Sequence, residues 1–312
     1  MSALTTQTAA PAPERARPWR SAERHIVLVG NGNASGVGRS RAALVAACRS
    51  LGLRGVRVET HLTESPAELA AAWPSFADRR VVLLGGDGTL HAAANLPPGP
   101  PDFAILPAGR ANNVARALGI PLGLKAAAEL AAEGRPRHLD LIAATSDELS
   151  YRAVEGVSVG LHAVARAGYR APNSADLPAA ARSALRAARA FDGVTLSLSS
   201  DGVPEVLAVG QLFVANLSLY AFGLRVAPSA RPDDGRLDVV ALPWEGRARI
   251  LPMVARLRRG THVERASTRV WSAERVRVAT GGRSPVVADT TNLGTGPVTL
   301  EVAPAALPLV AP

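Results

Sequence analysis

Short, unbroken apolar runs alternate with alanine-rich segments of helical periodicity along the first 140 or so residues. The apolar runs are typical of buried strands, and the segments between them are typical of helices that bury one face. A repeated strand-helix order predicts a mainly parallel sheet with helices on both faces. The expected strands lie near 26–30, 55–60, 81–84 and 103–106, and the expected helices near 39–51, 66–73, 90–95 and 122–133.

The pattern changes after about residue 140, where strand-like segments are separated by turn dipeptides such as Asp192-Gly193 and Asp234-Gly235. Many short strands with such turns predict an antiparallel β-sandwich. Two helices, near 176–191 and 246–259, are expected to interrupt it. The expected strands lie near 139–144, 151–158, 194–199, 205–216, 223–227, 237–242, 268–279 and 298–302.

These patterns divide the chain into a disordered tail (1–22), an α/β domain (23–139), a β-sandwich domain (140–288) and a C-terminal segment (289–312). With 47% hydrophobic residues, both domains can bury a core. We see neither the roughly 20 uninterrupted apolar residues of a membrane span nor a signal peptide. One cysteine excludes an internal disulfide, so we expect a cytoplasmic protein.

The most informative segment follows the strand at 81–84, which runs directly into Gly85, Gly86, Asp87, Gly88 and Thr89. Three glycines let the backbone turn sharply and approach a ligand, so that exposed N–H groups can hold phosphate oxygens. An aspartate in such a loop suits holding Mg²⁺ against phosphate or orienting a hydroxyl nucleophile. The competing interpretation is an ordinary strand-to-helix turn capped by Asp87.

Four blocks in this chain resemble known kinase motifs. Gly-Gly-Asp-Gly-Thr occurs both in diacylglycerol and sphingosine kinase-type lipid kinases and in NAD kinases. Residues 31–36 (Asn-Gly-Asn-Ala-Ser-Gly), 105–121 (Ile-Leu-Pro-Ala-Gly-Arg-Ala-Asn-Asn to Gly-Ile-Pro) and 227–240 (Ala-Pro-Ser-Ala to Asp-Asp-Gly-Arg-Leu-Asp-Val-Val) resemble the bacterial lipid kinases more specifically. The blocks stand in that family's order over roughly residues 25–312, and the last two argue against an NAD kinase.

The resemblance implies a Rossmann-like first domain of the NAD kinase and lipid kinase type, to which the C-terminal segment returns. It implies ATP and Mg²⁺ as cofactors and γ-phosphoryl transfer to a hydroxyl of diacylglycerol or a related lipid. It assigns the catalytic roles to Asp87 and Asp289. The nucleotide-binding residues it implies are Asn31, Ser35, Gly36, Gly85, Gly86, Asp87, Gly88, Thr89, Gly109, Arg110 and Asn112.

The Asp233-Asp234-Gly235 turn is a candidate metal site. In the resembled family the second aspartate of this segment and flanking carbonyls hold a structural Mg²⁺. This implies Asp234 as ligand, with the backbone carbonyls of Arg231 and Arg236. A simple β-turn is the competing interpretation.

The chain departs from the family where substrate and base should lie. The family's Asp-Gly-Glu, whose Glu serves as general base, reads Asp289-Thr290-Thr291 here. A threonine hydroxyl cannot take a proton at neutral pH. Asp289, Glu155 and His162, the last two also departures, are candidate replacements, and Arg110 replaces a phosphate-loop Thr. Two outcomes follow: an altered acceptor, or a weakened or inactive member that binds nucleotide or lipid.

The net charge of +9 favours anionic partners such as nucleotides or acidic lipid surfaces. With 4% aromatic residues and no recognisable motif, we expect no nucleic-acid partner. Arg182, Arg186 and Arg189 share one helix face. That face is either solvated or contacts anionic lipid head groups, which would add peripheral contact with the inner membrane face. The sequence does not indicate an oligomeric state.

Overall fold

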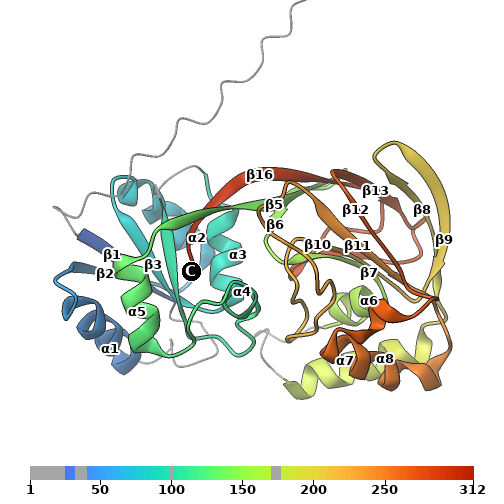
Figure 1. Ribbon diagram of the computed structural model, residues 1–312, viewed down its shortest axis with the longest axis horizontal. Coiled ribbons are helices and arrows are strands. Elements are labelled where there is room, and N and C mark those ends of the chain that lie inside the picture. Colours follow the sequence, from blue (N-terminus) through green and yellow to red (C-terminus); the bar gives the residue numbers. More distant parts are fainter. Residues whose placement is uncertain (1–24, 32–40, 98–101, 170–176) are drawn as a thin grey trace, which may run out of the picture.

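The structure is a computed structural model in which two halves stand side by side (Figure 1). Two long strands, β5 (Pro136–Ser146) and β16 (Val298–Val310), run across both halves. They pair antiparallel over most of their length, from Val298 opposite Ser146 to Val310 opposite Pro136. The residues that the structure describes are 25–31, 41–97, 102–169 and 177–312.

The first half is built on four parallel strands in the order β2-β1-β3-β4. The residues of β3 are buried throughout because both faces of the sheet are covered, which explains its unbroken apolar run. The bounds are β1 His25–Asn31, β2 Arg57–Thr63, β3 Arg80–Gly85 and β4 Phe103–Pro107.

Helices cover both faces of this sheet, as the sequence pattern predicts. Helices α1 (Arg41–Gly52) and α5 (Leu124–Glu133) bury alanines and leucines against one face. The other face packs on α2 (Pro66–Ala72), the 3₁₀ helix η3 (Trp73–Phe76), α3 (Asp87–Ala94) and α4 (Asn113–Ala117). The α/β architecture predicted for this part is confirmed.

The first sheet does not stop at β4. Leu309 of β16 pairs in parallel with Phe103 of β4, and the other end of β16 pairs with β13, which continues to β8 and β9. One ten-stranded sheet therefore passes from the first half into the second. The added strands are β6 Ser150–Ala153, β8 Val194–Ser200, β9 Val203–Val209 and β13 Arg275–Ala279.

A second, six-stranded antiparallel sheet packs on this continuation and completes the predicted β-sandwich. Along β10, Leu212 and Val214 join the core between the sheets, whereas Phe213 and Ala215 face the other way. The strands are β7 Gly156–Gly160, β10 Gln211–Ala215, β11 Leu237–Leu242, β12 Arg269–Ala273, β14 Val286–Ala288 and β15 Thr291–Asn292.

Helices of the second half cluster on the outer side of this second sheet (Figure 1). They are α6 (Leu161–Ala167), α7 (Leu177–Ala190) and α8 (Ile250–Arg259), with the 3₁₀ turns η4 (Arg247–Arg249) and η5 (Thr261–Glu264) flanking α8. Within the described ranges, no helix is long and apolar enough to cross a bilayer.

The structure corrects several expected elements. The segments 151–158, 205–216 and 268–279 each form two strands in different sheets rather than one. The segment 223–227 is not a strand but part of a turn closed by a bridge between Tyr220 and Leu224. Helix α3 begins at Asp87 rather than at Leu90, and α6 was not expected.

Candidate functional site

Two glycines bring the loops after β3 and β4 into direct backbone contact. A Cβ atom added to Gly86 would lie 2.8 Å from the Cα of Gly109, and one added to Gly109 would lie 2.6 Å from the Cα of Gly86. A Cβ on Gly85 would lie 2.2 Å from Thr89 Oγ1. Any side chain at these positions would push the loops apart, so the glycines are required by packing as well as by backbone approach.

Asp87 is the first residue of α3 and is half-buried. Its Oδ1 accepts a hydrogen bond from the backbone N–H of Val114, 3.0 Å away, which ties α3 to α4. Among the described residues no hydrogen bond to Oδ2 is found. The carboxylate is therefore fixed at one oxygen, at the helix end where backbone N–H groups favour anions.

The loop before α4 is held by Asn112. Its backbone is left-handed, with φ 48°, and its side-chain amide bonds both the N–H and the carbonyl of Gly109, at 3.0 and 2.9 Å. Arg110 lies exposed in this loop. The loop geometry thus presents Arg110 beside the Gly86–Gly109 contact.

The loops after β1, β3 and β4 share the carboxyl edge of the parallel strands, where open α/β sheets bind ligands. Asn31 ends β1, one residue after Gly30, which pairs with Leu84 of β3. Ser35 and Gly36 lie outside the described residues.

A buried polar cluster continues from Asp87 into the second half. His91, one helical turn along α3, places Nε2 at 2.9 Å from Glu155 Oε1 and 3.7 Å from Asp289 Oδ2. Asn113 of α4 donates to Glu155 Oε2 over 2.7 Å. Both ring nitrogens of His91 are buried without a hydrogen bond of good geometry among the described residues, so the 2.9 Å contact with Glu155 is an ion pair. The cluster joins two helices of the first half to the β6–β7 connection.

Asp289 is the fixed point of this cluster. Its φ of 49° is left-handed, and its carboxylate accepts hydrogen bonds from the backbone N–H groups of Val154, Glu155 and Gly156 at 2.9, 2.9 and 3.2 Å. The hydroxyl of Tyr220 donates to the backbone carbonyl of Asp289 over 3.0 Å. Both carboxylate oxygens are therefore engaged.

The cluster around His91 contains more acidic groups than basic ones, and this shifts the pKa values of its members. Burial disfavours the imidazolium of His91, but the charges of Asp289 and Glu155 outweigh it and raise its pKa to about 9. Burial raises the pKa of Glu155 above its ordinary value, with His91 opposing this and Asp87 and Asp289 adding to it. His91 is consequently a buried cation at neutral pH, held between acids from both halves.

Thr291 occupies the position where the resembled family has its general base, and it lies at the edge of the cluster. It is half-buried in β15 and hydrogen-bonds the hydroxyl of Tyr151. That hydroxyl is 3.5 Å from Asp289 Oδ2. Burial and the charge of Asp289 raise the pKa of Tyr151, so the phenol stays neutral at ordinary pH.

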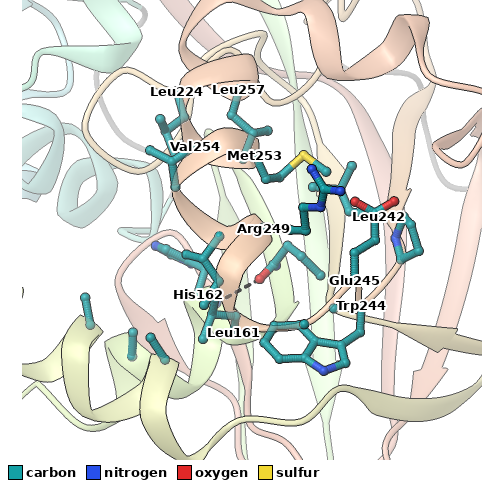
Figure 2. Close-up of a pocket in the computed structure, with 18 of the residues that line it drawn as sticks. Leu161, His162, Leu224, Leu242, Trp244, Glu245, Arg249, Met253, Val254 and Leu257 are labelled. Atoms are coloured by element: carbon teal, nitrogen blue, oxygen red, sulfur yellow. Dashed lines mark hydrogen bonds between the residues drawn. The ribbon is translucent and has the colours of Figure 1, made fainter.

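An apolar pocket of about 230 Å³ opens between α6, α7, α8 and the ends of β10 and β11 (Figure 2). His162 of α6 lies at its wall, with Nδ1 2.9 Å from Ser158 Oγ and its backbone N–H donating to Gln211 Oε1 over 2.8 Å. Other lining side chains include Leu161, Leu242, Trp244, Met253, Val254 and Leu257. The His162 ring centroid is 5.2 Å from that of Tyr220, which contacts Asp289, so one side chain separates the pocket from the polar cluster.

The turn at Asp234 lies apart from these sites. Asp234 is exposed, and its Oδ1 accepts a hydrogen bond from the backbone N–H of Arg236 over 3.1 Å. Burial and the charge of Asp234 raise the pKa of Asp238 to about 6. Asp234 on the turn and Asp238 at the start of β11 are neighbouring acids whose oxygens and negative charge suit a hard cation such as Mg²⁺.

The structure thus brings Gly85, Gly86, Asp87, Gly109, Arg110 and Asn112 together at one edge, with Asp289 in the adjacent cluster. Sequence reasoning did not identify His91, Asn113, Tyr151 or Tyr220. His91 carried a signal, because residues four apart share a helix face and His91 follows Asp87 by four. The tyrosines carried none, because their partners are distant in sequence.

Comparison with known proteins finds related families for both halves. Residues 25–144 match the diacylglycerol kinase catalytic domain, and residues 155–311 match the YegS C-terminal NAD kinase beta sandwich-like domain. A diacylglycerol kinase of Mycobacterium tuberculosis is 28% identical over 257 residues, which is 78% of this chain and 80% of that protein. A YegS-like lipid kinase of Stenotrophomonas maltophilia is 28% identical over 205 residues, 61% of this chain and 65% of that protein.

Solved structures agree on the fold. A diacylglycerol kinase from Bacillus anthracis superposes with a TM-score of 0.67 at 17% identity, covering 93% of this chain and 97% of that one. Another Bacillus anthracis structure reaches a TM-score of 0.73 at 19% identity, covering 93% and 98%. At these identities the likeness concerns the fold, and it confirms the predicted α/β half followed by an antiparallel β-sandwich.

Proposed function

Because the chain belongs to the diacylglycerol kinase and YegS family of lipid kinases, we propose that it transfers the γ-phosphoryl group of ATP to a hydroxyl of diacylglycerol or a related lipid. One observation carries the proposal. The Asp87 carboxylate is fixed at the N-terminus of α3, next to the Gly86–Gly109 contact at the carboxyl edge of the sheet. A triphosphate placed there meets backbone N–H groups and a carboxylate that suits a bound metal ion.

Different groups of the chain would bind the phosphates and the metal ion at this edge. The backbone N–H groups of Gly86 and Gly88 and the guanidinium of Arg110 would hold phosphate oxygens, and Thr89 would contribute through its side-chain hydroxyl. Asn31, Ser35 and Gly36 would contribute from the loop after β1. Mg²⁺, when bound beside Asp87, would neutralise charge on the phosphates. A second Mg²⁺ at Asp234, with the carbonyls of Arg231 and Arg236, would stabilise the turn rather than act in the reaction.

Transfer requires that the lipid hydroxyl lose its proton as its oxygen bonds to the γ-phosphorus and ADP leaves. Thr291 cannot accept that proton. We assign acceptance to Glu155, because its two carboxylate oxygens contact the side chains of His91 and Asn113, whereas those of Asp289 are held by three backbone N–H groups, and because burial raises its pKa. Both carboxylate oxygens of Asp289 are hydrogen-bonded, and one of them accepts from the backbone N–H of Glu155. Asp289 therefore holds Glu155 in position, and its negative charge favours the cationic form of His91.

The acceptor's hydrocarbon part would enter the apolar pocket, and the surface around it suits an anionic membrane. Arg182, Arg186 and Arg189 of α7 are exposed, as are Leu185 and Leu251. Arginine near an anionic bilayer contributes roughly 1 kcal/mol per side chain to binding. We propose peripheral contact through α7 and α8, which would deliver lipid to the pocket between them.

Incubation with γ-labelled ATP, Mg²⁺ and a panel of lipids in mixed micelles tests the function. Label should appear in at least one hydroxyl lipid and not in NAD. The absence of Glu at position 291 favours a second candidate, a catalytically silent member. If the protein is such a silent member, it should bind nucleotide and lipid, and no labelled lipid should appear in any fraction.

A further inference from the structure

We propose that a groove on the outer face of the first sheet, where β5, β16 and β13 lie side by side, binds the phosphate group of a soluble phosphate monoester through Arg277. The groove has a volume of about 320 Å³, and its lining includes Thr145 of β5, Thr299 of β16 and Arg275 and Arg277 of β13. It belongs to the second half and does not include any residue of the proposed nucleotide edge.

The strand register places one row of polar side chains across this face. Arg277 is paired with Thr299, and Thr299 is paired in turn with Thr145. Directly paired residues of antiparallel strands point to the same side of a sheet, with Cβ atoms about 4.5–5.5 Å apart. The neighbouring Val278 and Leu300 point the other way and fill the core between the two sheets. One guanidinium and two hydroxyls therefore lie side by side on the solvent face, held by the ladder of three strands.

The hydrogen-bonding groups of this row have no partner from the chain. Arg277 is exposed and forms no ion pair with any residue that the structure describes. By contrast Arg269, which is also exposed on a strand, pairs with Glu205 at 2.8 Å. The hydroxyls of Thr145 and Thr299 likewise make no hydrogen bond within the described part of the chain. A positive fork of N–H donors beside two hydroxyls is a set that the oxygens of a phosphate group satisfy.

Charge is distributed unevenly along the groove. Arg275 lies on the same face as Arg277, two residues earlier on β13, and its Nε is 3.0 Å from Glu301 Oε1, which holds the guanidinium in place. The acidic lining residue, Asp147, comes two residues after Thr145, so the register puts it at the end remote from Arg275. Asp147 repels anions and lies outside the phosphate subsite. The groove therefore suits one phosphate group on a neutral remainder and disfavours a polyanion such as a triphosphate.

The place of the groove in the fold favours a soluble ligand over a lipid head group. The strands β13 and β16 lie on one side of the sandwich, and α7 and α8 lie on the opposite side (Figure 1). The exposed leucines Leu185 and Leu251 belong to α7 and α8. A bilayer bound through those helices leaves the groove facing the solution, where a phosphate monoester reaches it by diffusion.

Calorimetric titration of the full chain with inorganic phosphate and with glycerol 3-phosphate, at constant ionic strength, measures the site. We expect saturable binding of both, weakened at least about tenfold by Arg277→Gln, because a charge-assisted hydrogen-bonding partner is lost. Thr299→Val keeps the charge and the β-branched shape, and it should weaken binding by roughly threefold or more. Arg269→Gln is the matched control on another strand, and Arg110→Gln removes the donor proposed at the nucleotide edge. Both should retain this binding.

Co-sedimentation with phosphatidylcholine vesicles, with and without phosphatidylglycerol, separates a soluble phosphate from a lipid head group. Arg277→Gln should leave vesicle binding unchanged. The proposal is overturned if folded Arg277→Gln binds both phosphates as tightly as wild type, or if Arg277→Gln lowers vesicle binding instead. It is also overturned if Thr299→Val has no effect while Arg269→Gln weakens binding as much as Arg277→Gln does, because the attraction is then diffuse charge alone. Labelled lipid is not a readout here, so failure of the proposed kinase function leaves this result unaffected.

Discussion

The imidazole of His91 lies 2.9 Å from the carboxylate of Glu155, and this buried ion pair joins helix α3 of the first half to the β6–β7 connection of the second. A turn further along the helix, Asn95 bonds both the N–H and the carbonyl of Arg152. The two halves are therefore held together along one face of the helix that begins with Asp87. Any group bound at Asp87 faces a wall whose position depends on His91 and Glu155.

The His91 pair predicts a pH dependence of stability. The neighbouring acids raise its folded-state pKa from 6.5 to about 9 against the effect of burial. A raised pKa means that the stabilisation is complete below about pH 6.5 and is lost as the pH rises through about 9. Relative to His91→Gln, the wild type should lose up to about 1.4 kcal/mol of unfolding free energy per pH unit in that window. Urea unfolding across the window measures this, and parallel profiles for the two proteins would refute it.

A second buried ion pair, in the first half, should be sensitive to the removal of one partner. Arg80, fully buried, donates from Nε and a terminal nitrogen to Asp102 at 3.1 and 2.8 Å and from its other terminal nitrogen to the carbonyl of Ala131 at 2.8 Å. Asp102→Ala should cost about 3–5 kcal/mol, because it removes the negative charge that balances a buried guanidinium. Chemical denaturation measures the loss. Glu301→Ala, which removes the partner of an exposed pair with Arg275, should change stability by less than about 1 kcal/mol.

The contact between Gly86 and Gly109 predicts opposite effects for two nearby glycines. Gly86→Ala should destabilise by roughly 1–3 kcal/mol, because its Cβ would overlap the backbone of Gly109. Gly88→Ala should stabilise by about 0.5–1 kcal/mol, because Gly88 is exposed within α3 and has no neighbour within 4 Å of an added Cβ. Equal changes in the urea midpoint for both variants would contradict the proposed loop contact.

A cation at the Asp234 turn should be visible without any assay of activity. Adding Mg²⁺ to chelator-treated protein should raise the melting temperature, and at 100 times the dissociation constant the gain would be about 2.7 kcal/mol. Asp234→Asn should abolish the response. Asp233→Asn is the matched control, since Asp233 instead pairs with Arg137 at 2.7 Å. A magnesium response that survives in Asp234→Asn would place the ion elsewhere.

Local patterns sufficed for much of the fold. The strand at 81–84 was predictable because both faces of β3 are buried, which demands an unbroken apolar run. The sandwich followed from its turn dipeptides. The paths of single strands did not, because only Val154 and Glu155 separate β6 from β7, and the neighbouring Gly156 is itself the first residue of β7 rather than part of a loop.

The site was predictable where its residues are adjacent in sequence and obscure where they are not. Asp87 and its glycines form one segment. Asp289, by contrast, is bonded to backbone 133 to 135 positions earlier, and only the folded chain brings it to His91. The start of α3 at Asp87 was also missed, because Gly86 at the N-cap and Gly88 in the first turn disguise a helix that tertiary contacts stabilise.

The transfer of labelled phosphate from γ-labelled ATP to lipid by wild type and by Asp87→Asn tests the central claim most directly. The substitution preserves shape and can keep the bond from the Val114 N–H, while it removes the charge. We predict labelled lipid with wild type and with the remote exposed control Asp147→Asn, and a loss of at least about 100-fold with Asp87→Asn. Undiminished transfer by a folded Asp87→Asn protein, or no labelled lipid with wild type, would contradict the account.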